Sequence, residues 1–120
     1  MTDTATEIEI PGYITRAKTL ADMMQATADL LEQATDNNLP TPSHATLYQG
    51  CQEVRLGFPG ERDSFHALAD WATRFGGTVT GEPYKRDGGE LSVYCQVRFA
   101  SQGLAVEASA FIPADQLGIT

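Results

Sequence analysis

Long apolar runs are absent from this sequence of 120 residues. No stretch approaches the roughly 18 consecutive apolar residues that a membrane-spanning helix needs. The segment from Met1 to Glu7 is polar and acidic, and it lacks the basic and then apolar regions of a secretory signal. We therefore expect a cytoplasmic protein without a membrane partner.

Basic residues are few, because eight lysines and arginines stand against 16 aspartates and glutamates, for a formal net charge of −8. A field of this sign repels nucleic acid and anionic lipid. The closest basic clusters are only pairs, Arg16 with Lys18 and Lys85 with Arg86. The composition argues against direct nucleic-acid binding. It is typical of a highly soluble surface, and it would also attract a basic protein partner.

Cysteine is scarce, and the two examples are Cys51 and Cys95. In a reducing compartment we expect them to be free thiols. With His44 and His66 they could in principle supply four zinc ligands, but the four residues show neither C-x-x-C nor H-x-x-x-H spacing. We therefore expect no metal and no cofactor.

Motifs of catalysis are missing as well. The loop Gly57–Gly60 precedes a predicted helix but has no phosphate-binding lysine after it. His66 and Asp70 share a helix face, yet no nucleophile motif such as G-x-S-x-G accompanies them. We expect a protein that is not an enzyme, and the alternative is an enzyme or small-ligand binder with its site around His66, Trp71 and the Gly57–Gly60 loop.

What the sequence does contain is a long alternating stretch from Glu90 to Ile112. Apolar residues occupy every second position on both sides of Ser101-Gln102-Gly103, which predicts two long strands joined by a hairpin loop. Pro113 ends the second strand. One face of this hairpin is apolar and includes Cys95, so other elements must pack against it to bury it. The opposite face carries Tyr94, Gln96, Arg98, Glu107, Ser109 and Phe111.

Two helices are predicted to provide the cover. The first runs over 16–36 with Thr15 as its N-cap. Its stripe is Leu20, Met23, Met24, Thr27, Leu30, Leu31 and Ala34. The second runs from Arg62 or Asp63 to Phe75, with Asp63 or Ser64 as the N-cap. Trp71 flanks its apolar stripe, and Gly76-Gly77 ends it.

The remaining strands are predicted over 45–49 and 52–58, with a turn at Gly50-Cys51, and over 78–82. We predict an α+β fold in which two helices cover one face of an antiparallel sheet of about five strands, in the order α-β-β-α-β-β-β. One domain spans 1–120. Within it, 1–12 is an N-terminal arm or edge strand that includes Thr6–Ile10, and 113–120 is a tail in which Leu117 could dock.

The order of these features resembles a group of small proteins of unknown activity from actinobacteria and their phages. Three segments carry the resemblance: Leu20-Ala21-Asp22 through Ala28-Asp29-Leu30, Asn38-Leu39-Pro40-Thr41-Pro42, and Ala67–Ala72 closing on Gly76-Gly77-Thr78. The resemblance implies a phage or mobile-element origin. It implies no activity, cofactor or catalytic residue.

The leading functional hypothesis is a non-enzymatic accessory protein that binds another protein. In its sharpest form the partner is a nucleic-acid-binding host protein, and the acids of the first helix mimic phosphates. Those acids are Asp22, Asp29, Glu32 and Asp36, and they run against the helix dipole because the bases precede them. A further alternative is a homodimer through the mixed sheet face, where Tyr94, Arg98 and Phe111 are the candidate contact residues.

Overall fold

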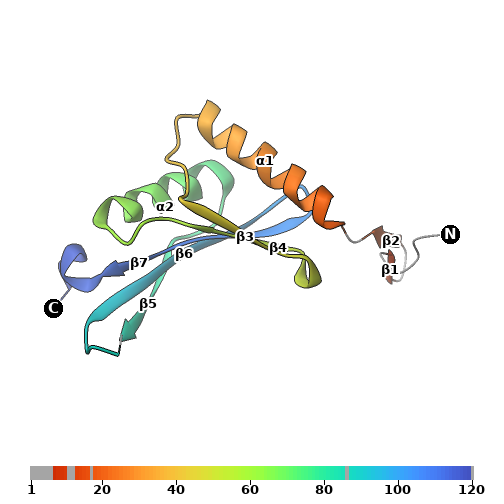
Figure 1. Cartoon of the computed structure of the whole chain (residues 1–120). Coiled ribbons are helices and arrows are strands. Elements are labelled where there is room, and N and C mark those ends of the chain that lie inside the picture. Colours follow the sequence, from red (N-terminus) through yellow and green to blue (C-terminus); the bar gives the residue numbers. More distant parts are fainter. Residues whose placement is uncertain (1–6, 11–12, 17, 86, 120) are drawn as a thin grey trace.

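The computed structural model describes residues 7–10, 13–16, 18–85 and 87–119. The α+β class is confirmed: both helices lie on one side of a five-stranded sheet (Figure 1). The elements are β1 (Glu7–Ile10), β2 (Tyr13–Arg16), α1 (Leu20–Asp36), β3 (His44–Tyr48), η2 (Gln49–Cys51), β4 (Glu53–Gly57), α2 (Arg62–Phe75), β5 (Thr80–Lys85), β6 (Leu91–Ser101), β7 (Leu104–Pro113) and η3 (Ala114–Leu117). No helix in the described part of the chain is long and apolar enough to cross a membrane.

The sheet has the strand order β3-β4-β7-β6-β5. The long hairpin β6–β7 lies at its centre, as the alternation predicted. Its loop is shorter than expected, because Ser101 and Leu104 already pair and only Gln102 and Gly103 turn. Both turn residues have positive φ, 49° and 80°, which is the backbone of a tight two-residue hairpin turn.

One strand pair departs from the expected antiparallel arrangement. β4 runs parallel to β7, with Val54 opposite Val106, while the other pairs of the sheet are antiparallel. A parallel pair needs a crossover connection. Here the chain between the two strands supplies it with α2, β5 and β6.

The N-terminal region differs from the prediction in two ways. β1 does form over Glu7–Ile10, but it pairs with an unpredicted strand β2 in a separate two-stranded sheet and is no edge of the main sheet. The predicted first turn of the helix at Arg16 is therefore wrong, since Arg16 ends β2. The rest of the predicted arm, 1–6 and 11–12, lies outside the described residues.

Helix α1 begins at a capping box four residues later than predicted. The Asp22 N–H donates to Thr19 Oγ1 at 3.1 Å, and the Thr19 N–H donates to Asp22 Oδ2 at 3.2 Å. Thr19 is thus the N-cap in place of Thr15. An acid in the first turn stabilises the helix dipole, so the expected opposition between charge and dipole does not hold at Asp22.

The core lies between the helices and the inner sheet face. Helix α1 contributes Met23, Ala26, Thr27, Leu30 and Ala34, so its buried stripe is rotated from the predicted one. Leu20 and Met24 are exposed, which corrects their assignment to the core. Cys95 is buried on the inner face as predicted.

Trp71 is the centre of this core and not the edge of a helix stripe. Its side chain is fully buried, and its ring meets Phe58 edge-on at a centroid distance of 5.8 Å. Phe75 and Phe99 lie at 5.1 and 6.3 Å. The indole N–H donates to the carbonyl of Pro40 at 2.7 Å. A large ring with its polar group satisfied is a stable core residue.

Helix α2 has the predicted bounds but neither of the predicted caps. Its N-cap is Glu61, which makes no side-chain capping bond, and the Ser64 hydroxyl donates instead to the carbonyl of Pro59. The helix ends at two glycines as predicted. Gly77 has φ +97°, and a Cβ there would lie 2.5 Å from the carbonyl oxygen of Arg98, so a glycine is needed for the close approach to β6.

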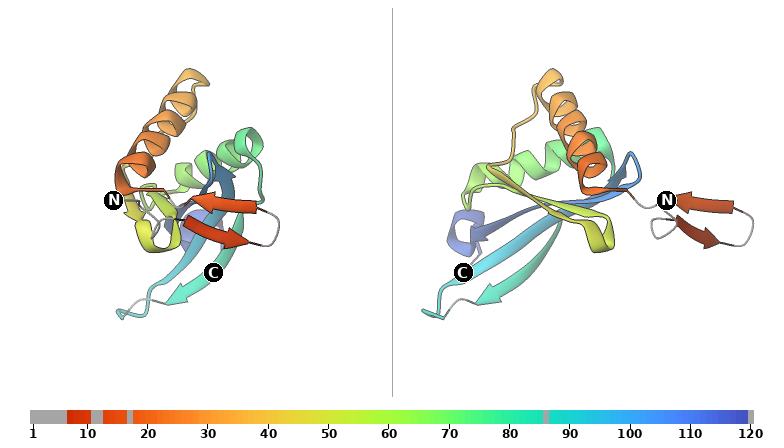
Figure 2. Two further views of the ribbon diagram at one scale, coloured as in Figure 1. Left: turned by 90° about the vertical axis from the view of Figure 1, so that its right-hand side faces the viewer. Right: turned by 45° about the vertical axis from the view of Figure 1, so that its right-hand side comes forward.

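The last two differences concern β5 and the tail. β5 spans Thr80–Lys85 and not 78–82, so Tyr84 and Lys85 belong to a strand. Pro113 is part of β7, and the tail forms the short 3₁₀ helix η3. Leu117 docks against the core, as predicted. Figure 2 shows that both helices stay on one side of the sheet when the molecule is turned.

Candidate functional site

The face of the sheet opposite the helices gathers most of the polar and aromatic residues that the alternation placed there. Cross-strand register puts Tyr94 beside Phe111, Gln96 beside Ser109 and Arg98 beside Glu107. This sharing of one face is confirmed. We call it the open face, and we define it by the outward side chains of β3–β7: Thr46, Tyr48, Glu53, Arg55, Glu82, Tyr84, Ser92, Tyr94, Gln96, Arg98, Glu107, Ser109 and Phe111.

Glu107 is the unexpected centre of the open face. Its exposed fraction is 3%, although it points away from the helices. Both carboxylate oxygens are used. Arg98 donates to Oε1 from Nη2 at 2.7 Å and from Nε at 3.0 Å, and the Tyr94 hydroxyl donates to Oε2. Burial of a carboxylate is costly unless such charge-assisted bonds compensate it, so this network fixes the positions of both partners.

Burial raises the pKa of the Tyr94 phenol, and its hydrogen bond to Glu107 raises it further. Because the neutral form is favoured in the fold, Tyr94 keeps its proton and continues to donate to Glu107 at neutral pH. The stabilisation from this raised pKa is complete below the ordinary phenol pKa, and it is lost as the pH rises through the higher folded-state value.

A second ion pair lies beside the first on the open face. Arg55 Nε contacts Glu53 Oε2 at 2.9 Å, and the Arg55 guanidinium lies 4.8 Å from the centre of the Tyr48 ring. The hydrogen bond from Arg55 to Glu53 and the charge of Glu53 raise the Arg55 pKa. In the register of the parallel strands, Arg55 on β4 lies opposite Glu107 on β7. The cationic and anionic groups therefore alternate across β4, β7 and β6.

Three aromatic rings form a contiguous row at the other end of the open face. Phe111 lies between Tyr94 and Tyr84, at centroid distances of 4.6 and 5.2 Å. Phe111 is 40% exposed and Tyr84 is 49% exposed. Aromatic side chains exposed next to one another on the face of a sheet are typical of an interaction surface. Phe111, Tyr94 and Arg98 were predicted from the sequence, whereas Tyr84, Tyr48 and Arg55 were not.

The four acids predicted as a partner-binding surface on the first helix form no network comparable to that of the open face. Asp22 takes part in the capping box, and Asp29 accepts a hydrogen bond from Gln25 at 2.9 Å. Glu32 and Asp36 are exposed. Two of the four acids thus have roles within the fold, and the structure adds no feature to this helix face that would select a partner.

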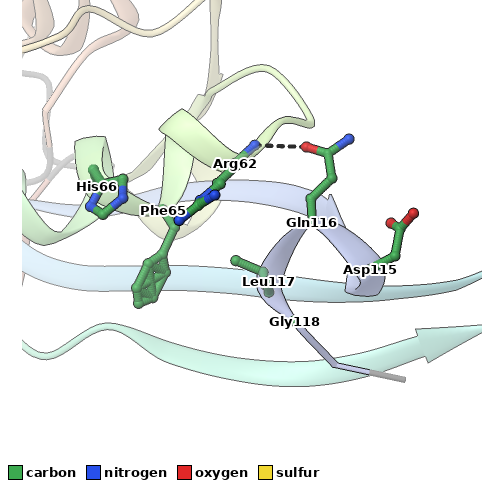
Figure 3. Close-up of a pocket in the computed structure, with 7 residues that line it drawn as sticks. All are labelled: Arg62, Phe65, His66, Asp115, Gln116, Leu117 and Gly118. Atoms are coloured by element: carbon green, nitrogen blue, oxygen red, sulfur yellow. Dashed lines mark hydrogen bonds between the residues drawn. The ribbon is translucent and has the colours of Figure 1, made fainter.

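The alternative site around His66 and Trp71 is not assembled as one site. Trp71 is fully buried, whereas His66 is exposed. His66 instead lines a hollow of about 420 Å³ between the first turns of α2 and η3, shown in Figure 3. The other lining residues are Arg62, Phe65, Asp115, Gln116, Leu117 and Gly118. Gln116 accepts a hydrogen bond from the Arg62 backbone N–H at 2.9 Å, and this bond holds the start of α2 against the tail beside the hollow.

Metal-ligating side chains are not brought together in the described part of the chain, where no group of three or more His, Cys, Asp and Glu could hold an ion. Of the four residues considered for zinc, Cys95 is buried in the core and Cys51 is exposed. His44 lies over Gly57, where any Cβ would overlap its imidazole ring.

The two thiols should differ sharply in reactivity. Cys51 is exposed, whereas Cys95 is buried and burial raises the pKa of its thiol. Because the thiolate is the reactive form, we expect one equivalent of a disulfide reagent to react quickly with the native protein and the second to react only after denaturation. Stoichiometry measured by absorbance, with a C51S variant as the control, tests this. Two fast thiols in the native state would contradict the buried position of Cys95.

Comparison with known proteins gives no relative for this chain. No family model, no curated protein and no solved structure matches it. The open face therefore has to be interpreted from its own chemistry.

Proposed function

We propose that this chain is a non-enzymatic protein-binding domain and that the open face of its sheet is the docking surface. The observation that carries the proposal is the aromatic row of exposed Tyr84 and Phe111 and half-buried Tyr94, beside side chains held in place by Glu107. Tyrosine, phenylalanine and arginine are enriched in the centres of protein interfaces. Here all three types lie on one surface.

The ordering of the open face strengthens the proposal. Binding loses free energy whenever mobile side chains must be immobilised, at about 0.5–1.5 kcal/mol for each long one. Tyr94 and Arg98 are already fixed by hydrogen bonds to Glu107 in the free domain. Arg55 is similarly tied to Glu53. Much of this cost is therefore met in folding, which leaves a surface suited to association.

Site-specific photo-cross-linking tests the proposal. A photoreactive phenylalanine analogue replaces Phe111 in one variant and Met24 in another, because both side chains are exposed but only Phe111 belongs to the open face. After irradiation in a lysate of the organism that encodes the chain, we expect a discrete protein adduct from position 111 and none from position 24. Equal adducts at both positions, or none at 111, would overturn the proposal.

Competition separates specific docking from random capture. If the captured partner is a different protein, unlabelled protein in excess should abolish the adduct at position 111, because it occupies the same partner. If the partner is a second copy of the chain, the excess should instead increase an adduct with the mass of two chains. An F111E variant in the same excess should compete poorly, since a carboxylate replaces the centre of the aromatic row. Equal competition by both proteins would show that the open face does not make the contact.

A further inference from the structure

We infer that the occupant of the open face is a second copy of this chain, stacked sheet against sheet around a two-fold axis. The inference rests on the proposed function, since it names the partner of that same surface. Its basis is the charge, chemistry and size of the open face.

Charge separates the open face from the rest of the chain. The chain carries a formal net charge of −8. On the open face, however, Arg98 is paired with Glu107 and Arg55 with Glu53, so these four charges cancel. Glu82 adds one carboxylate on β5. Almost all of the net charge therefore lies elsewhere, and a second copy meets the least repulsion here.

The same pairing makes other partners less suitable. Nucleic acid or another polyanion needs arginines that are available to phosphate. Both arginines of the open face already hold carboxylates at 2.7–2.9 Å. A strongly basic protein would be drawn to the acidic surface outside this face. The partner surface that best complements a neutral aromatic face is another neutral aromatic face.

Two-fold symmetry allows the aromatic and charged groups of one copy to contact complementary groups of the other. A two-fold interface uses the same patch on both partners. The open face has exposed aromatic rings at one end, Tyr84 and Phe111, and the Arg55–Tyr48 cation–π pair at the other. With the in-plane axis perpendicular to the strands and passing near Ser109, each strand lies over its own copy. Tyr94 of one copy then lies over Arg98 of the other, where a further cation–π contact forms.

The open face is large enough for a stable dimer. The central strands have 10 and 11 residues and the outer strands 5, 5 and 6, which at about 3.3 Å per residue and about 4.8 Å between strands give a footprint of about 590 Å² for each copy. Two such footprints bury about 1,200 Å², the lower end of the range for specific interfaces. Both helices of each copy would then face outward, so that each sheet is covered on both sides.

Sedimentation equilibrium over about 1–500 μM protein tests the inference, because this range brackets the affinities expected for a modest interface. The expected result is a mass approaching twice the 13.0 kDa of one chain. F111E should raise the dissociation constant at least about tenfold, as loss of a central aromatic residue does. M24E, on exposed α1, is the matched control and should leave the constant unchanged. Y84E provides a second open-face variant, and circular dichroism verifies that each variant is folded.

Two outcomes would overturn the inference. One is a mass of 13.0 kDa at every concentration. The other is a dimer that M24E disrupts and F111E does not, which would place the contact on α1. The cross-linking experiment separates this failure from failure of the proposed function. A monomer whose position 111 cross-links to a different protein keeps the docking surface and loses the second copy, whereas a monomer without an adduct at 111 loses both.

Discussion

Replacing Trp71 with alanine is expected to lower the free energy of unfolding by about 3–5 kcal/mol, the usual loss for a buried aromatic side chain. Trp71 is fully buried, its ring contacts Phe58, Phe75 and Phe99, and its indole N–H bonds to Pro40. A domain of this size has about 5–15 kcal/mol of stability in total. The loss should therefore appear as a large fall in the urea midpoint, measured by circular dichroism.

Two further variants make this expectation testable even if W71A does not fold. W71F keeps an aromatic ring but loses the hydrogen bond to Pro40, so a smaller loss of about 1–3 kcal/mol is expected from the lost hydrogen bond and the reduced packing. M24A removes an exposed side chain of α1 and should change the stability by less than about 0.5 kcal/mol. Equal midpoints for W71F and the parent protein would show that Trp71 is not the centre of the core.

Replacing Glu107 with glutamine is expected to lower the free energy of unfolding by about 1.5–3 kcal/mol, because hydrogen bonds to a charged group are lost or weakened. Glu107 is almost fully buried and holds both Arg98 and Tyr94. The same change should lower the pKa of Tyr94, which the hydrogen bond to Glu107 helps to raise. The pKa should stay above its usual value, since burial is its first cause. Phenolate absorbance during a pH titration measures this second effect.

The matched control for this prediction is E53Q. Glu53 and Arg55 form the neighbouring ion pair on the same sheet face, but the Glu53 side chain is 19% exposed, against 4% for Glu107. The arginine is exposed in both pairs, at 50% for Arg55 and 71% for Arg98. A pair whose carboxylate is more exposed contributes less, about 0–1 kcal/mol. We expect E53Q to have a small effect on stability and none on the titration of Tyr94. Similar losses of unfolding free energy in E107Q and E53Q would mean that the burial of Glu107 adds nothing to the stability contributed by its ion pair.

The sheet could be predicted from the sequence largely because its central strands are long. Ten or eleven alternating residues in β6 and β7 define two faces without ambiguity, and Tyr94, Arg98 and Phe111 were assigned to the open face on that basis. The parallel pairing of β4 with β7 could not be predicted this way. Val54 and Val106 belong to distant parts of the chain, and alternation gives the face of a strand but not its neighbour.

Some of the errors had a signal that was available. Thr19 and Asp22 have the spacing of a capping box, which marks the start of α1 more securely than an isolated threonine. Tyr84 lies beyond the predicted strand over 78–82, and Pro83 does not interrupt the actual strand because proline is tolerated on an edge strand such as β5. The burial of Glu107 had no such signal. It depends on Arg98 and Tyr94, which become its neighbours only once the register between β6 and β7 is known.

The parallel pair also sets the order in which the chain can fold during synthesis. β4 leaves the ribosome about 50 residues before β7, and until then it has a hairpin partner on one side only. α2 is likewise complete before the strands β6 and β7 that its apolar face covers. Contacts of such long sequence separation slow folding. The sheet can therefore close only after its last strand has been made, and a chain that stops short of β7 is expected to remain without a stable core.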